Sequence, residues 1–130
     1  MAEKILARHS GVDTVKPGDL VVCDVDMAVQ LDRSFATFIP NRISDPEKVA
    51  VVMDHTIPAP SIFDAEYHTK SREFVKQFGV KRFYDVGDHG ICHQVILETG
   101  LALPGELTAC GDSHASASGA LNAAARGLGS

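Results

Sequence analysis

Four short apolar runs, separated by segments long enough for helices or loops, constrain the fold of this chain more than any other feature. The runs are LVVCDV at 20–25, KVAVVM at 48–53, RFYDV at 82–86 and LTAC at 107–110. Short runs rich in β-branched or aromatic residues are typical of buried strands. Strands that alternate with helices usually pair in parallel. The sequence therefore predicts an α/β fold with three layers, α/β/α, around a mainly parallel sheet.

Helices are predicted over residues 2–9, 63–79 and 91–100, where apolar residues recur at helical spacing. Gly11 and Gly79 are suitable C-terminal stops. Residues 27–42 are ambiguous, with a short helix ended by Pro40 as one interpretation. The small residues of 116–129 predict a last helix that packs close to a neighbouring backbone or leaves room for a ligand.

The bulk properties indicate one soluble domain and exclude several classes of protein. The 130 residues are 45% hydrophobic and 22% charged, and no apolar run is long enough to span a membrane. The charged start, MAEKILARHSG, is unlike a signal peptide and predicts a cytoplasmic protein. A net charge of −5 argues against nucleic acid as a partner. Three widely spaced cysteines in such a chain predict free thiols.

Three of the predicted strands end in turns that carry both a carboxylate and an imidazole. Asp54 and His55 follow the second run, the segment GDHGICH at 87–93 follows the third, and Asp112, Ser113 and His114 follow the fourth. The carboxyl ends of parallel strands lie at one edge of a sheet, where ligands collect. A carboxylate beside a histidine fixes its tautomer and suits either proton transfer or support of a metal ligand.

These residues also have simpler interpretations. Asp112 and Ser113 are good N-cap residues for the helix expected after them, although a cap does not explain His114. His89 and His93 stand four residues apart and could share a helix face as metal ligands, but Gly90 could place His89 before the helix. We therefore retain only His93 as a site residue.

Five further side chains are expected to lie outside the site. His9 and His68 are predicted to be solvated histidines on helix surfaces. Cys23 and Cys92 are predicted to pack as small apolar groups. Cys110 could be a reactive thiol next to the turn, but burial at the end of its strand is the favoured interpretation.

Several blocks of the sequence resemble the aconitase superfamily, and more narrowly the large subunits of 3-isopropylmalate dehydratases and homoaconitases. The blocks are MAEKILARHSG, VKPGDLV, VMDHTIPAP and GICHQVILETGLALPGELTACGDSHASASGALNAAARGLG. The resemblance implies dehydration and rehydration of a hydroxy di- or tricarboxylic acid on a [4Fe-4S] cluster. The substrate implied by overall similarity is 3-isopropylmalate, interconverted with 2-isopropylmalate, and a small subunit that forms a swivelling domain is implied as partner.

The resemblance also implies roles for individual residues. Asp54 and His55 match the pair that handles the proton of the leaving hydroxyl, and His93 matches a histidine near the active-site iron. Asp112 and His114 match the groups that hydrogen-bond the water on that iron, with Ser113 between them. Gln30 and Asp32 are the implied substrate-binding residues, and Leu31 departs from the family pattern, which has His or Gln at its position.

By this resemblance, residues 1–130 form the N-terminal part of an aconitase-like large-subunit domain that stops before the cluster-ligand region. The cysteine ligands of the cluster are then expected outside this chain, no residue is assigned as a metal ligand, and the chain alone is predicted to be inactive. Two alternatives stay open. One is a homoaconitase or a malate- or maleate-type hydratase. The other is a stand-alone, non-catalytic α/β module that binds a small carboxylate or one metal ion through His55, His93 and His114.

Overall fold

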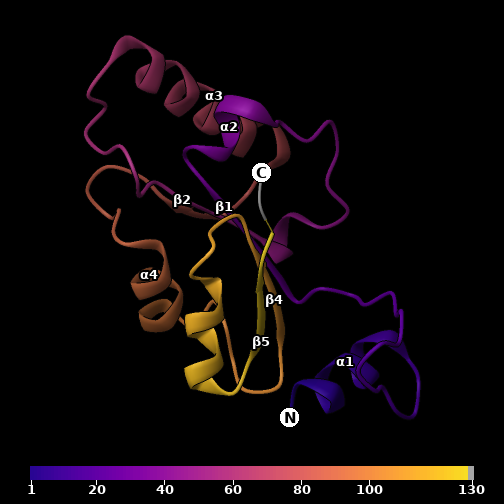
Figure 1. Ribbon diagram of the computed structural model, residues 1–130. Coiled ribbons are helices and arrows are strands. Elements are labelled where there is room, and N and C mark those ends of the chain that lie inside the picture. The colour runs from indigo at the N-terminus through magenta and orange to yellow at the C-terminus, as the bar shows by residue number, and fades with distance from the viewer. Residues whose placement is uncertain (129–130) are drawn as a thin grey trace.

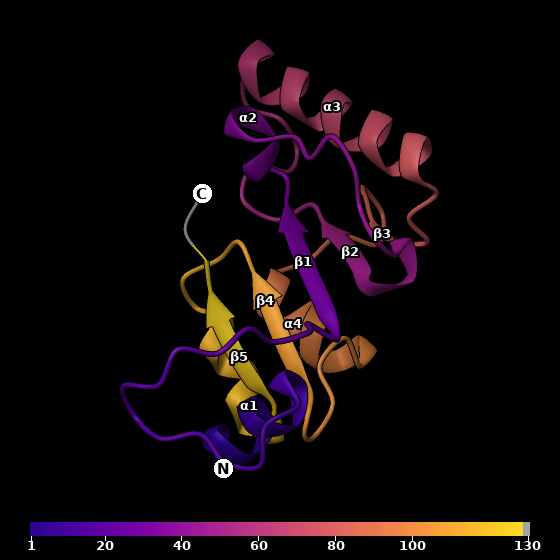
Figure 2. The ribbon, with the colours of Figure 1, turned by 90° about the vertical axis from the view of Figure 1, so that its right-hand side faces the viewer.

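The computed structural model describes residues 1–128 and contains one five-stranded sheet (Figures 1 and 2). The strands are β1 (Met27–Leu31), β2 (Val49–Val52), β3 (Arg82–Tyr84), β4 (Leu107–Cys110) and β5 (Ala124–Gly127). Their order is β3-β2-β1-β4-β5, and every neighbouring pair is parallel. The predicted α/β class and parallel sheet are confirmed.

Helices cover both faces of the sheet, as Figure 1 shows. One face carries α2 (Ser34–Thr37) and α3 (Ile62–Phe78), and the other carries α4 (Cys92–Thr99) and the 3-10 helix η2 (Ala115–Leu121). Alternate residues of β2 divide between the layers: Val51 packs in the core cluster of α3, and Val52 packs in that of α4. The period-two pattern of a strand thus produces the three predicted layers.

The strand order places a topological switch point in the middle of the sheet. The chain passes from β1 to β2 and β3 through α2 and α3, and then reaches β4 and β5 through α4 and η2 on the opposite face. β1 and β4 are neighbours in the sheet. The connection that follows β1 leads to β2 on one side, and the connection that follows β4 leads to β5 on the other side. In open parallel sheets, ligands bind outside the carboxyl ends of the strands at this point.

The strand predicted at 20–25 is wrong, because the central strand begins at Met27. Residues 20–25 have no regular structure, and Leu20 is 99% exposed. The segment instead passes over α1 (Ala2–Ser10), where the Asp24 amide donates to the His9 carbonyl. The burial of β1 alternates along MAVQL, which suits a strand between two neighbours, whereas the helix expected within 27–42 is confined to α2.

The predicted C-terminal helix is also wrong in most of its length. The chain forms η2 up to Leu121, turns at Asn122, which has a φ of 60°, and continues as β5. The left-handed backbone at Asn122 ends the helix, and pairing with β4 then decides the structure of 124–127. The end of this predicted helix, Gly129, lies outside the described residues.

The remaining predicted elements are confirmed with small shifts of their ends. Helices α1, α3 and α4 occupy the predicted segments, and Gly11 and Gly79 end the first two in left-handed conformation. A short 3-10 helix, η1 (Pro46–Lys48), leads into β2. Within residues 1–128, no helix combines the length and the apolar character that crossing a bilayer requires.

Candidate active site

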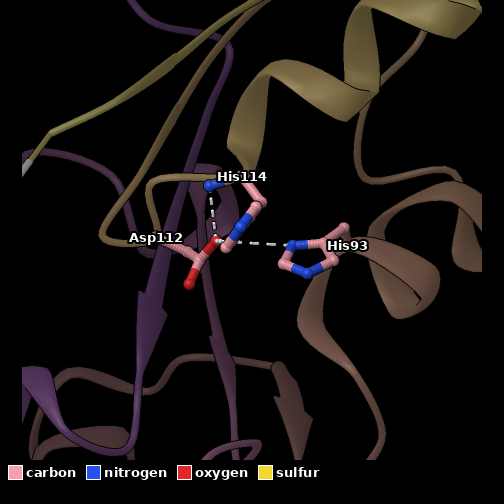
Figure 3. A group of neighbouring side chains, drawn as sticks. All are labelled: His93, Asp112 and His114. Atoms are coloured by element: carbon pink, nitrogen blue, oxygen red, sulfur yellow. Dashed lines mark hydrogen bonds and ion pairs between the residues drawn. The ribbon is translucent and has the colours of Figure 1, made fainter.

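The turns at the carboxyl edge of the sheet meet at the side chain of Asp112. Its Oδ2 lies 3.5 Å from Nε2 of His55, which follows β2. Its Oδ1 lies 3.5 Å from Nδ1 of His93, at the start of α4, and 3.2 Å from Nδ1 of His114. Figure 3 shows the side chains of His93 and His114 next to this carboxylate. Three imidazoles from three separate segments therefore share one carboxylate.

Asp112 is held in place by its own turn. Oδ1 accepts a hydrogen bond of 2.7 Å from the backbone N–H of His114, and the side chain is buried. Burial raises the pKa of Asp112, but the hydrogen bond from His114 and the charge of His93 outweigh it, so this pKa lies below its usual range. The predicted N-cap is replaced by this local turn, because η2 has His114 at its N-cap position and no side chain caps it. Ser113 is exposed.

The two histidines on Oδ1 differ in their surroundings. The side chain of His93 is 26% exposed, but its Nδ1 is buried and has no hydrogen-bond partner among the described residues. The side chain of His114 is 77% exposed. The site is therefore buried at His93 and open to solvent at His114. The buried Nδ1 of His93 has no partner among the described residues and could bind a ligand.

A buried carboxylate holds the His55 turn. Asp32 follows β1, is fully buried, and accepts hydrogen bonds from the backbone N–H groups of His55 and Thr56 and from the Thr56 hydroxyl. Asp54 accepts a 2.8 Å hydrogen bond from the Cys92 amide and so ties the same turn to the start of α4. Both carboxylates position neighbouring backbone, and the substrate-binding role of Asp32 stays a prediction.

His68 supports this turn from α3, so the prediction of a solvated histidine is wrong. The residue is 3% exposed, and its Nε2 lies 3.1 Å from Thr56 Oγ1 and 3.6 Å from Asp32 Oδ2. The Thr56 hydroxyl is thus contacted by Asp32, by Tyr67 and by His68. The missed signal is helical spacing: His68 shares the buried face of α3 with Ser71 and Phe74.

His9 is likewise not a solvated residue. Its Nδ1 lies 2.7 Å from the Ile5 carbonyl oxygen, and its Nε2 lies 2.5 Å from Asp26 Oδ2. Asp26 directly precedes β1 and also accepts from the Leu107 amide at the start of β4. The pair therefore fastens α1 to the amino end of the sheet, opposite the Asp112 turn.

Gln30 and Leu31 make no hydrogen bond or ion pair with the Asp112 carboxylate among the described residues. Leu31 is buried in the core beneath α4, and Gln30 lies on the other face of β1. Gln30 lines an apolar groove with Ala28, Ser34, Phe38, Ala109, Gly111 and Leu128. None of Asp54, His55, His93, Ser113 or His114 lines that groove, and the substrate-binding role of Gln30 stays a prediction.

The cysteines of the chain do not converge on a shared site. The Sγ atoms of Cys92 and Cys110 lie 3.9 Å apart in the core between α4 and the sheet, as expected for buried thiols. The hydrogen bond to Cys110, together with burial, raises the pKa of Cys92 far above its usual range. Cys23 lies elsewhere, with Sγ 3.6 Å from the Leu6 carbonyl oxygen. An iron–sulfur cluster needs several thiolates around one space, so these residues do not fit one.

Comparison with known proteins gives consistent matches over almost the whole chain. Residues 8–130 match the aconitase family (aconitate hydratase). The 3-isopropylmalate dehydratase large subunit of Mycolicibacterium smegmatis is 57% identical over 98% of this chain and 31% of its own length. The probable large subunit of Methanothermobacter thermautotrophicus is 44% identical, and the large subunit of Aquifex aeolicus is 40% identical, each over 100% of this chain and 32% of the relative. The chain thus spans about a third of the length of the curated relatives it matches.

Proposed function

Because the chain belongs to the aconitase family, we propose that it supplies part of the active site of a hydro-lyase that removes and re-adds water on a hydroxy di- or tricarboxylic acid. The names of its relatives support 3-isopropylmalate, interconverted with 2-isopropylmalate, as the substrate. We further propose that residues 1–130 are the N-terminal part of a large-subunit domain. As part of the same proposal, the full-length protein binds a small subunit and is located in the cytoplasm.

The observation that carries this proposal is the carboxylate of Asp112 shared by three imidazoles. Loss of water from a hydroxy acid needs a proton for the departing hydroxyl, and re-addition needs a base that takes a proton from water. His55 is suited to donate the first proton, because Asp32, Asp54 and Asp112 all lie within 4 Å of its ring nitrogens. These carboxylates orient the imidazole ring of His55 and hold its nitrogens in place.

His93 and His114 are suited to hold the water between the two half-reactions. Both present Nδ1 to the same oxygen of Asp112, and the open side of the site lies next to His114. A water molecule hydrogen-bonded to these groups would be oriented by one acceptor and two imidazoles. Ser113 lies on the exposed side of the same turn, with its hydroxyl 3.5 Å from His114 Nδ1.

Family membership implies a [4Fe-4S] cluster in the full-length enzyme. Cys92 and Cys110 face the core and Cys23 lies near α1, so no group of three thiolates surrounds a common space in residues 1–128. We therefore propose that the cluster ligands belong to the part of the longer protein that the relatives have and this chain does not cover. The steps described above use only residues of this chain.

The proposal is tested by expressing the full-length protein with its small subunit without oxygen and assaying 3-isopropylmalate, homocitrate and malate side by side. Formation of the unsaturated acid is followed by ultraviolet absorbance. We expect the highest kcat/KM for 3-isopropylmalate and no turnover by the 130-residue chain alone. A higher kcat/KM for homocitrate or malate would contradict 3-isopropylmalate as the substrate. Turnover by the isolated chain would contradict the proposal that it supplies only part of the active site.

A further inference from the structure

His68 lies on α3, behind the turn that carries His55, and the proton-transfer steps proposed above do not use it. Its side chain is buried, and its Nε2 lies 3.1 Å from Thr56 Oγ1 and 3.6 Å from Asp32 Oδ2. We propose that His68 is a positioning residue, which acts through Thr56 and Asp32 to hold the imidazole of His55 in the orientation that proton transfer needs. This inference rests on the role that the proposed function gives to His55.

The turn that carries His55 is held by side chains. The ladder between β1 and β2 ends at Val52, and within residues 1–128 no backbone–backbone hydrogen bond involves residues 54–60. The backbone N–H groups of His55 and Thr56 donate instead to the carboxylate of Asp32. The position of His55 therefore depends on how the carboxylate of Asp32 is fixed.

The two oxygens of Asp32 face different partners. Oδ1 accepts a hydrogen bond from the backbone N–H of His55, and Nδ1 of His55 lies 3.9 Å from it. Oδ2 accepts from the backbone N–H and the hydroxyl of Thr56, and Nε2 of His68 faces the same oxygen. Because both oxygens belong to one planar group, the contacts that fix Oδ2 also fix the direction in which Oδ1 faces His55.

His68 is the buried partner of a buried carboxylate. Asp32 is fully buried, and within residues 1–128 the basic side chains that pair with it within 4 Å are those of His55 and His68. A carboxylate that has lost its water needs hydrogen bonds or an opposite charge in its place. The side chain of His55 is 34% exposed, whereas the ring of His68 packs edge-on against Tyr67. His68 therefore supplies the contact that solvent does not reach.

The test compares two amide variants in the full-length protein with its small subunit. In His68→Gln the amide stands near the position of Nε2 and offers a donor and an acceptor, whereas the shorter side chain of His68→Asn does not reach Thr56. We expect kcat for 3-isopropylmalate to fall about 10- to 100-fold in His68→Asn, with KM within about twofold. His68→Gln should recover most of this kcat.

Thr56→Val completes a double-mutant cycle, because it removes the hydroxyl and keeps the shape of the side chain. Since His68 acts through Thr56, the double variant with His68→Asn should lose little more kcat than the single variant with the larger loss. Ser71→Ala is the matched control. Ser71 shares the buried face of α3, and its hydroxyl donates to the Tyr67 carbonyl within the helix, so kcat should stay within about twofold.

An unchanged kcat in His68→Asn would overturn the inference, as would equal losses in His68→Asn and His68→Gln. Losses that multiply in the double variant would show that His68 does not act through Thr56. An equal loss in Ser71→Ala would show that packing of α3, and not the contacts of His68, sets the rate. Absence of turnover by the unmodified protein would instead overturn the proposed function, so the two failures are distinct.

Discussion

The two ends of the central strands carry the same pair of residue types in opposite arrangements. At the amino end, His9 and Asp26 form a single ion pair in which both ring nitrogens have a partner within 2.7 Å. At the carboxyl end, Asp112 faces three histidines at 3.2–3.5 Å, and one of their nitrogens has no partner among the described residues.

The difference distinguishes a contact that only holds the fold together from a cluster that still has a polar atom free for a ligand. The amino-end pair is closed, because Asp26 also accepts the Leu107 amide and His9 also contacts the Ile5 carbonyl. In the carboxyl-end cluster three imidazoles face one carboxylate at 3.2–3.5 Å, and the cluster opens to solvent at His114. Residue types alone therefore do not identify a site, whereas the completeness of hydrogen bonding does.

The largest expected effect is on turnover at the open end. In the full-length enzyme, Asp112→Asn removes the shared charge but keeps an acceptor for the His114 amide, and we expect kcat to fall about 10²- to 10⁴-fold. The control is His9→Gln, which changes the closed pair and should leave kcat within about twofold. Steady-state kinetics with 3-isopropylmalate measure both. An Asp112→Asn enzyme with more than a tenth of the original kcat would contradict the proton-transfer assignment.

The second expected effect is on stability at the closed end. Asp26→Asn weakens a charged hydrogen bond to His9, so the free energy of unfolding should fall by about 1.5–3 kcal/mol. His114→Gln, an exposed change at the open end, should alter it by less than about 0.5 kcal/mol. Denaturant unfolding of the chain measures both values. Equal losses would show that the two ends do not differ as described.

A third substitution disturbs the open end without altering any histidine or carboxylate. A Cβ at Gly127 would lie 2.5 Å from the Asp112 carbonyl oxygen and 3.0 Å from the Ser113 Cα. Gly127→Ala should therefore displace the turn and lower the free energy of unfolding by about 1–3 kcal/mol.

Gly119→Ala is the matched control, because a Cβ at Gly119 meets no atom within 4 Å. In denaturant unfolding, Gly127→Ala should have a lower free energy of unfolding than Gly119→Ala. If Gly127→Ala behaves like Gly119→Ala, the close packing of β5 against the turn does not hold the site in place.

The smallest effect is the pH dependence of the closed pair. Burial raises the pKa of Asp26, but the hydrogen bond from the Leu107 amide and the contacts with His9 and Lys48 outweigh it, so the pKa is lowered. A lowered carboxyl pKa contributes stability above the unfolded value of about 3.9, and this contribution is lost as pH falls through the folded value.

We therefore expect the chain to lose stability more steeply than Asp26→Asn below about pH 4. Thermal unfolding at a series of pH values measures the two slopes. Parallel curves would mean that the Asp26 carboxyl does not contribute to the acid sensitivity of the fold.

The meeting of the polar turns could be predicted from the sequence, because the geometry of a parallel sheet dictates it. Once residues 48–53, 82–86 and 107–110 are strands, whatever follows them lies at one edge. Asp112 at the centre of three imidazoles could not be predicted in the same way. Its position depends on the short turn formed by the His114 amide, and on which strand lies beside which.

Two strands were missed because pairing partners override local preference. LVVCDV at 20–25 has more β-branched residues than MAVQL at 27–31, yet only the second lies between β2 and β4. Alanine-rich residues 124–127 favour a helix in isolation, but the ladder with β4 determines their structure. The burial of His68 could have been predicted from helical spacing, because His68 shares one face of α3 with the buried residues Ser71 and Phe74.

The central place of β1 has a consequence for how the chain folds. β1 can pair with β2 soon after both are synthesised, but its other partner, β4, begins about 80 residues later, as the Asp26–Leu107 contact shows, with a sequence separation of 81. Contacts that close such long loops form late and slow the folding reaction. During synthesis, one edge of β1 stays without a partner and is open to association with other chains. The turn that carries Asp112 lies beyond β4, so the polar edge of the sheet is completed among the last parts of the structure.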